Sequence, residues 1–224
     1  MEKHYHRELE SLKGQLLGMA RKVQGMLANS IAALTSLDAG KIEEVNSSEH
    51  DVNLLEIEID GQCLKLIALY QPVGQDLRLL NIVSKINNDL ERVGDEAVNI
   101  CERVCRLIKD PRLERGDILP QMYDIAREML DKAIISLEKN DLAIADDIFR
   151  KEDILDDLNR RMTRDAIEQI KRRPEITDLA LDIISISHRL ERIGDMAVNI
   201  AEDIIFFITG EDARHPNDQV KDRQ

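Results

Sequence analysis

The stretch LERVGDEAVNI at residues 90–100 occurs a second time, nearly unchanged, as LERIGDMAVNI at residues 190–200. Nine of the eleven positions are identical. The two differences exchange a valine for an isoleucine and Glu96 for Met196. Because such similarity at a fixed offset indicates an internal repeat, each half of the chain is predicted to be one copy of the same module.

Apolar residues recur around both stretches at spacings of three and four, the period of an amphipathic α-helix. In the first copy they are Ile86, Leu90, Val93, Ala97, Ile100 and Val104. In the second copy they are Ile186, Leu190, Ile193, Ala197, Ile200 and Ile204. One face of each predicted helix therefore belongs to a core.

The opposite face of each predicted helix carries a row of oxygen-bearing side chains about one helical turn apart. The two rows are Glu91, Asp95 and Asn99 in the first copy, and Glu191, Asp195 and Asn199 in the second. Two carboxylates at this spacing repel each other by a few tenths of a kcal/mol. The repeat keeps this unfavourable pair in both copies.

Two interpretations of these rows stay open. In the first, the rows are solvated surface, with Arg92 and Arg192 as counter-charges. In the second, they bind a hard metal ion, because such ions prefer carboxylate and amide oxygens. The second helix of each half completes a carboxylate cluster if it faces the rows. The side chains that it would add are Asn53, Glu56, Asp153 and Asp156.

The composition is typical of an all-α protein. The 224 residues include 33% charged and only 3% aromatic residues, with few Gly and Pro. The formal net charge of −13 argues against nonspecific binding to nucleic acid or to an anionic membrane. The three cysteines form no C-x-x-C pair, which favours a reduced, cytoplasmic setting.

Six helices are predicted, over residues 5–37, 41–70, 75–109, 118–138, 141–172 and 176–209. Turns at Pro72 and Pro174 occupy matching places in the two halves. Short connections make successive helices antiparallel neighbours, so each half is predicted to be a three-helix bundle. We expect domains at 1–112 and 113–210, related by an approximate two-fold axis, and a polar tail at 211–224.

The sequence lacks the common motifs of enzymes. Neither of the glycine-rich phosphate loops occurs, and H-E-x-x-H and the Glu-x-x-His pair of di-iron bundles are also absent. We therefore predict no catalytic residues and no enzymatic activity. The charged N-terminus does not have the pattern of a signal peptide, and no apolar run is long enough for a membrane span.

Two longer stretches resemble the PhoU family of bacterial phosphate-signalling regulators. VNLLEIEIDGQCLKLIALYQPVGQDLRLL (52–80), followed by DLERVGDEAVNICE (89–102), is similar to its first half. HRLERIGDMAVNIAEDIIFFITGEDARH (188–215) is similar to its second half. The resemblance covers nearly the whole chain, in the right order, and includes the turn Q-P-x-x-x-D-L-R at 71–78.

The resemblance implies two tandem three-helix bundles and a non-enzymatic, cytoplasmic role. PhoU proteins couple the phosphate ABC transporter, through its ATPase subunit, to a sensor histidine kinase, and they keep the phosphate-starvation response off. Several members carry metal on their E/D-x-x-x-D rows, which correspond here to Glu91 with Asp95 and to Glu191 with Asp195. The residue after the second acid, often His in relatives, is Glu96 or Met196 here.

We accordingly expect divalent or trivalent ions such as Mg, Mn, Fe or Zn on the rows, and a homodimer. A helical protein that binds or stores metal through its carboxylates is the alternative function.

Overall fold

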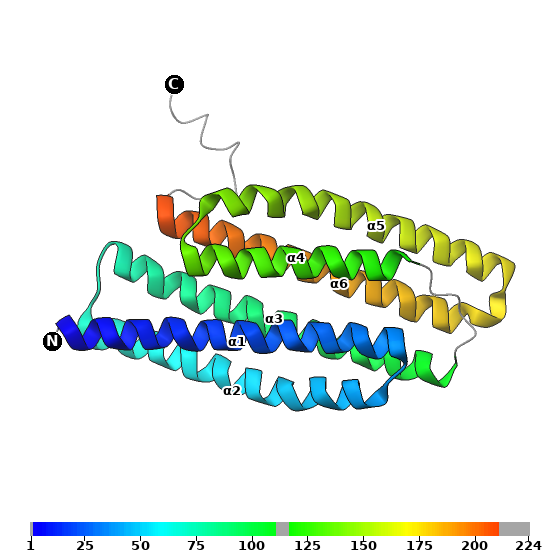
Figure 1. Ribbon diagram of the computed structural model, residues 1–224, viewed down its shortest axis with the longest axis horizontal. Coiled ribbons are helices and arrows are strands. Elements are labelled where there is room, and N and C mark those ends of the chain that lie inside the picture. Colours follow the sequence, from blue (N-terminus) through cyan, green and yellow to red (C-terminus); the bar gives the residue numbers. More distant parts are fainter. Residues whose placement is uncertain (1, 111–116, 211–224) are drawn as a thin grey trace, which may run out of the picture.

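Six long helices make up the computed structural model, which describes residues 2–110 and 117–210 (Figure 1). They are α1 (Glu2–Ser36), α2 (Ala39–Tyr70), α3 (Gln75–Lys109), α4 (Ile118–Lys139), α5 (Ala145–Arg172) and α6 (Thr177–Thr209). Two short 3-10 helices, η1 (Leu142–Ile144) and η2 (Pro174–Ile176), precede α5 and α6. The described ranges contain no strand, so the predicted all-α fold is confirmed.

The helix boundaries differ from the prediction at α5, which begins at Ala145 after η1 and not at residue 141, and at the first turn. α1 ends at Ser36, and Leu37 takes a positive φ of 56°. The Asp38 side chain then accepts a hydrogen bond from the Gly40 N–H at 2.8 Å and caps α2. The expected break at 38–40 therefore lies two residues earlier, because Ala39 and Gly40 already belong to the first turn of α2. The predicted tail, 211–224, and most of the predicted boundary segment lie outside the described residues.

Each half of the chain forms one antiparallel three-helix bundle, α1–α2–α3 or α4–α5–α6 (Figure 1). The apolar positions predicted for both motif helices are all buried, which confirms their core faces. If Gly94 were an alanine, its methyl group would lie 3.5 Å from Met26 Cε, an ordinary contact distance. At Gly194 the space is smaller, since a methyl group would lie only 2.5 Å from Leu155 Cδ2.

The two bundles meet where α3 packs against α6, and we call this contact the seam. Near one end of the seam, Lys85 Nζ lies 2.7 Å from Asp203 Oδ1. Near the other end, Arg106 Nε donates to Asp182 Oδ2 at 2.8 Å. An early residue of α3 thus meets a late residue of α6, and the reverse, so the two helices run antiparallel. This is the arrangement expected from an approximate two-fold axis between the repeats.

None of the described helices combines the length and the apolar character that a bilayer span requires.

Candidate functional site

The first carboxylate cluster lies between α2 and α3. Asn87 Nδ2 donates to the backbone carbonyl of Glu56 at 2.9 Å and so fixes the register of the two helices. Glu91 then faces α2. Burial raises the pKa of Glu91, and the negative charges of Asp95, Glu56 and Glu49 raise it further. The structure therefore brings Glu56 to the first row, as the sequence suggested.

An amide oxygen without a partner stands beside this cluster. Asn53 lies between Glu49 and Glu56 on α2, and its Oδ1 is buried with no hydrogen-bond partner among the described residues. A buried polar atom without a partner costs about 1–3 kcal/mol. An unpartnered oxygen acceptor among carboxylates fits a hard cation, which would supply the missing positive charge.

The second carboxylate cluster lies at the equivalent place between α5 and α6. Burial raises the pKa of Asp195, and the charges of Glu191 and Asp156 raise it further. The pKa of Glu152 is also raised, first by burial and then by Asp195, Asp156 and Asp153. Helix α5 thus faces the second row and adds the predicted Asp156 to it, whereas the exposed Asp153 acts only on its neighbours Glu152 and Asp156.

One member of the second cluster is held in a fixed orientation. Asn159 is buried, and its Nδ2 donates to Glu191 Oε2 at 2.9 Å. Ser187 Oγ in turn donates to Asn159 Oδ1, which fixes the amide. His188 Nδ1 lies 3.4 Å from the same Glu191 oxygen. In the first half the place of Asn159 is taken by Glu56, so the two clusters differ in charge.

Neither cluster is closed around an ion. Among residues 2–110 and 117–210, no three His, Cys, Asp or Glu side chains converge closely enough to hold a metal together. The carboxylates of each cluster lie close enough to shift one another's pKa values, and a change of side-chain rotamers is needed to bring them on to one ion. The donors are carboxylate and amide oxygens, which suit Mg, Mn or Fe better than soft metals.

The two asparagines of the rows face the seam instead of their own Glu/Asp pairs. Asn99 Nδ2 donates to Glu96 Oε2 at 3.2 Å. Asn199 lies beside Asp89 of the opposite helix and lowers the pKa of that carboxyl. The metal role expected for these two amides therefore stays a prediction, whereas their contacts across or beside the seam are present in the structure.

The arginines that follow the row glutamates form ion pairs at the seam. Arg92 Nη1 lies 3.1 Å from Asp89 Oδ1, and Arg192 Nη1 lies 2.8 Å from Glu96 Oε1. Both still act on the second row, because their charges lower the pKa of Asp195 against the larger effects of burial and Glu191. Their main partners, however, are not the row carboxylates proposed from the sequence.

Glu96 is the seam residue that sequence reasoning missed. Its side chain is only 5% exposed, and it pairs with Arg192 and, at 3.1 Å, with Arg189. A carboxylate this buried requires such partners. The available signal was the difference between the copies, since Met196 is apolar at the equivalent position.

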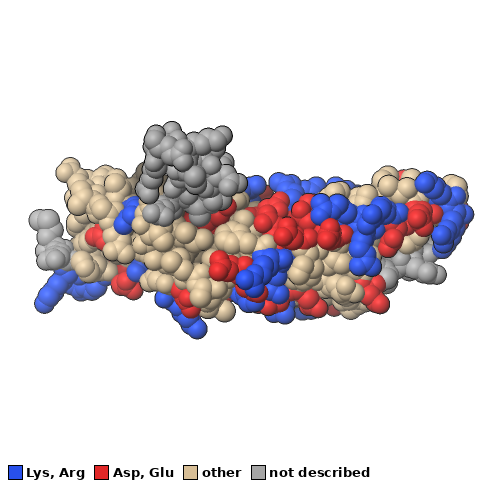
Figure 2. Space-filling model, turned by 90° about the horizontal axis from the view of Figure 1, so that it is seen from above, with Lys and Arg blue, Asp and Glu red and all other residues tan. Residues whose placement is uncertain are grey.

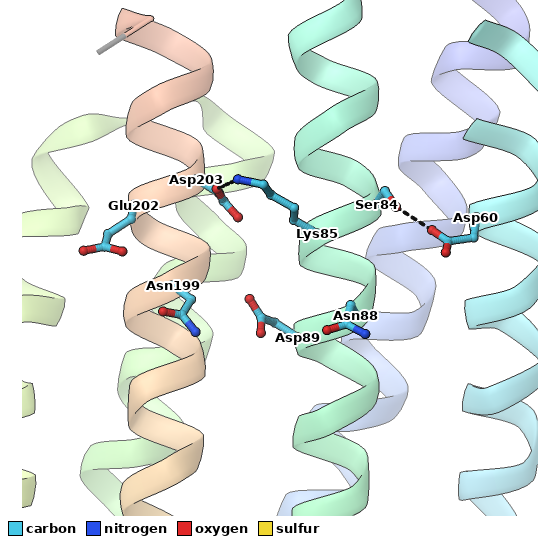
Figure 3. Close-up of a pocket in the computed structure, with 8 residues that line it drawn as sticks. All are labelled: Asp60, Ser84, Lys85, Asn88, Asp89, Asn199, Glu202 and Asp203. Carbon is cyan, nitrogen blue, oxygen red and sulfur yellow. Dashed lines mark hydrogen bonds and ion pairs between the residues drawn. The ribbon is translucent and has the colours of Figure 1, made fainter. Parts of the chain in front are cut away.

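A cleft of about 520 Å³ opens beside the seam between α2, α3 and α6 (Figure 3). Its lining is polar: Lys85 reaches Asp203, and Ser84 Oγ donates to Asp60 Oδ1 at 2.7 Å. Asp89 projects into the cleft from α3, and burial raises its pKa, with Asp203 adding to the effect. Of the charged groups that line this cleft, Lys85 and Asp203 pair with each other, and Asp89 pairs with Arg92 beside it.

Comparison with known proteins identifies this arrangement. The family model described as PhoU domain matches the chain twice, over residues 16–104 and 119–204. The chain belongs to the PhoU family. Both matched segments contain one motif stretch, so the internal repeat is the repeat of this domain.

The similarity to individual PhoU proteins extends over nearly the full length. A phosphate-specific transport system accessory protein PhoU homolog from Burkholderia is 36% identical, over 96% of this chain and 93% of its own. The crystal structure of PhoU from Pseudomonas aeruginosa has a TM-score of 0.89 at 29% identity, over 92% of this chain and all of its own. The phosphate transport system regulatory protein PhoU from Streptococcus pneumoniae has a TM-score of 0.86 at 27% identity, over 93% and 98%. These PhoU structures share the tandem three-helix architecture described above.

Proposed function

We propose that this PhoU protein is a cytoplasmic negative regulator of phosphate uptake and of the phosphate-starvation response. It contacts the ATPase subunit of the phosphate ABC transporter and a sensor histidine kinase, and it holds the response off while phosphate is plentiful. The supporting observation is the match of both PhoU domains, with relatives named as accessory or regulatory proteins of phosphate transport over the full length.

The protein acts in this proposal by contact and not by catalysis. The relatives are named for an accessory role and not for a reaction. Two long, rigid bundles with dense surface charge suit docking to other proteins, because complementary charge sets partner choice and encounter rate.

We further propose that the two carboxylate clusters bind hard metal ions. Supporting this are the raised pKa values of Glu91, Asp95 and Asp195, and the unpartnered oxygen of Asn53. A bound ion supplies positive charge, and it lowers the negative charge of the surface where α2 meets α3 and α5 meets α6. Asn159 keeps Glu191 oriented in the second cluster. The bound metal therefore tunes docking, whereas in the alternative of a metal store the release of the ion would itself be the function.

The deciding experiment is deletion of the gene in its host. The expected result is a phosphate-starvation response that stays on in rich phosphate and is switched off again by the intact gene. Purification of the tagged protein from phosphate-replete and phosphate-starved cells should recover the transporter ATPase and the kinase in different proportions. Normal repression in the deletion strain would reject the regulatory assignment.

Metal content separates the docking proposal from the metal store. The gene carrying Asp95→Asn and Asp195→Asn should still express a folded protein with less bound metal. Altered repression with that variant links the clusters to signalling. Unchanged repression, with metal lost, would contradict the proposed tuning by metal.

A further inference from the structure

An apolar groove of about 500 Å³ lies next to the polar cleft described above. Its apolar lining comes from three helices: Leu64 and Ile67 of α2, Leu77 of α3 and Phe206 of α6. Because α2 and α6 both pack against α3, the α3 residues form the floor of the groove. Leu64 and Leu77 are 68% and 42% exposed. Exposed apolar side chains that gather in one hollow indicate a contact surface, whereas scattered ones do not.

One arginine of the groove has no partner. Arg78 of α3 lines the groove, and its Nε is buried without a hydrogen-bond partner. Within residues 2–110 and 117–210, no carboxylate forms an ion pair with this guanidinium, although the chain has 44 acidic residues. A buried donor without an acceptor is unfavourable, so its presence points to an acceptor that binds from outside.

The end of α6 accounts for only part of the charge of Arg78. A Cβ atom on Gly210 would collide with Arg78 Nη1, so the guanidinium lies against the C-cap residue of α6. A helix C-terminus carries a partial negative charge of about half an elementary charge, which attracts the guanidinium. The Nε nevertheless lacks an acceptor. At the other end of the seam, Arg106 Nε has one, because it donates to Asp182 at 2.8 Å.

The second half does not repeat this feature. The motif stretches are offset by 100 residues, so Leu77 and Arg78 correspond to Thr177 and Asp178. Figure 2 looks on to the α5 side of the second half and shows acidic and basic side chains interspersed there. The fold itself therefore does not require an apolar residue followed by a sheltered arginine at this place.

The groove and the polar cleft are neighbours along α3, and we call the two together the trough. Both are lined by Asp60 and Ser84, whose side chains are hydrogen-bonded to each other at 2.7 Å. The part of α3 between Leu77 and Asp89 is about 18 Å long, which is the length of roughly three helical turns. Arg78 lies toward one end of the trough, and four carboxylates against one lysine line the other end (Figure 3).

We propose that the trough is the docking site of an amphipathic helix of a partner protein. The helix places an acidic side chain on Arg78, apolar side chains on Leu64 and Leu77, and basic side chains at the acidic end. Helices bind in such grooves through apolar residues three and four apart, and an arginine in an apolar hollow is typical of the residues that dominate binding. The inference rests on the proposed function, in which the partner is the transporter ATPase subunit or the sensor kinase.

The first test measures the binding of the purified full-length protein to each of these two partners by biolayer interferometry. Arg78→Glu should raise the Kd for one partner about tenfold or more, because it repels the acid that the wild type binds. Arg21→Glu makes the same change of charge at an exposed arginine of α1 outside the trough, and it should leave the Kd unchanged.

The outcomes separate the inference from the proposed function. If the wild type binds a partner and Arg78→Glu binds it equally well, the inference fails and the proposed function stands. If the wild type binds neither protein, the proposed function fails, and the inference fails with it.

The second test leaves Arg78 and its contact with α6 unchanged. Leu64→Glu, at an exposed position of the groove, should also raise the Kd about tenfold or more, with little change in melting temperature. The matched control is Leu181→Glu, at a leucine of α6 that is 53% exposed and lies outside the trough. Normal binding by Leu64→Glu would show that the partner does not enter the groove.

The third test identifies the residue that binds to Arg78. Exposed acidic residues on the helices of the partner are changed to arginine one at a time. One of these changes should restore binding to the Arg78→Glu chain and weaken binding to the wild type, because the charges of the pair are then exchanged. If no change restores binding, the proposed pair with an acidic side chain is wrong.

A last comparison addresses two other occupants of the trough. An anionic lipid would also supply an acceptor, although the net charge of −13 disfavours an anionic membrane. The wild type and Arg78→Glu should behave alike with vesicles of phosphatidylglycerol and phosphatidylethanolamine, and alike in sedimentation velocity without any partner. Vesicle binding or self-association that depends on Arg78 would assign the trough to a lipid or to a second copy, and would overturn the inference.

Discussion

The double variant Asp95→Asn, Asp195→Asn should change stability in opposite directions without and with metal. In the metal-free protein, both carboxylates are ionised at a cost, since burial and neighbouring acids raise their pKa values. Asparagine keeps the shape of the side chain and removes the charge. The metal-free variant should therefore be more stable than the wild type.

The expected gain follows from the pairs that the variant removes. Asp95 repels Glu91 and Glu96, and Asp195 repels Glu191, Asp156 and Glu152. The charges of Arg92 and Arg192, which lower the pKa of Asp195, offset two of these five pairs and leave three. At about 0.2–0.5 kcal/mol for each like-charge pair near a surface, three pairs give about 1 kcal/mol. For a chain of this size that corresponds to a rise of about 2–4 °C in melting temperature.

Metal should reverse the order of the two proteins. An ion present at one hundred times its dissociation constant stabilises the native state by about 2.7 kcal/mol. This increment should appear in the wild type with Mg²⁺, Mn²⁺ or Fe and be lost in the variant. The wild type should then melt above the variant.

The pH dependence gives an independent check of the sign. A group with a raised pKa in the folded state binds its proton more tightly there, so its contribution favours folding at low pH and is lost as pH rises through the folded pKa. The metal-free wild type should therefore gain stability relative to the variant as the pH falls from 7 towards 3.8, the ordinary pKa of an aspartate. Metal stabilisation should shrink over the same range, because protons compete for the carboxylates.

The assay is thermal unfolding followed by circular dichroism, with chelator or with added metal. Glu43→Gln combined with Glu138→Gln, two exposed acids outside both clusters, is the control for net charge. If metal leaves the wild-type curve unmoved and the metal-free variant is no more stable than the control, the rows are solvated surface and the reasoning is wrong.

Three further changes test the seam, the packing and the surface charges. Glu96→Gln should lower the free energy of unfolding, measured by urea denaturation, by about 1–2 kcal/mol, because Arg189 and Arg192 lose their carboxylate partner but remain partly solvated. The control Glu102→Gln, at an exposed position of the same helix, should change this free energy by less than about 0.5 kcal/mol. Gly94→Ala should stabilise the protein by up to about 1 kcal/mol, because alanine has the higher helix propensity. Gly194→Ala should destabilise the protein, because the added methyl group meets the buried Leu155. Equal effects of the two substitutions on the free energy of unfolding would contradict the packing described here. Lys132 and Lys151 lower the pKa of Glu128 to about 2, so Glu128 adds stability above its unfolded pKa that is lost as the pH falls towards 2. Glu128→Gln should thus cost less than about 1 kcal/mol at pH 7 and nothing near pH 2, and high salt should reduce the cost, since the site is exposed.

The fold was predictable because its signals are local and repeated. The apolar period of the motif helices identified residues such as Leu90 and Leu190 that are buried. Matching turns and short connections then led to two three-helix bundles. The helix starts were less predictable, as the first turn shows, where Asp38 is the N-cap of α2. The exact residue at which a helix begins depends on backbone angles, and the sequence pattern does not contain them.

The candidate site was predictable in part, for a geometric reason. Spacing along one helix placed Glu91 beside Asp95, but the partners from α2 and α5 depend on interhelical register. That register follows from contacts such as the hydrogen bond from Asn87 to the Glu56 carbonyl. No periodicity in either helix encodes this contact, so Glu56 and Asp156 remained candidates until the helices were placed.

The seam escaped sequence reasoning because the repeat hides it. Within each bundle, equivalent residues of the two copies occupy equivalent positions in the packing, so identity between the copies indicates shared structure. Across an antiparallel contact between the copies, each helix instead meets a different part of the other helix. Ion pairs there need opposite charges on the two repeats, as in Lys85 with Asp203 and Arg106 with Asp182. Charged positions at which the repeats differ are therefore the ones to test first for contact between the halves, and Glu96 opposite the arginines of α6 follows that rule.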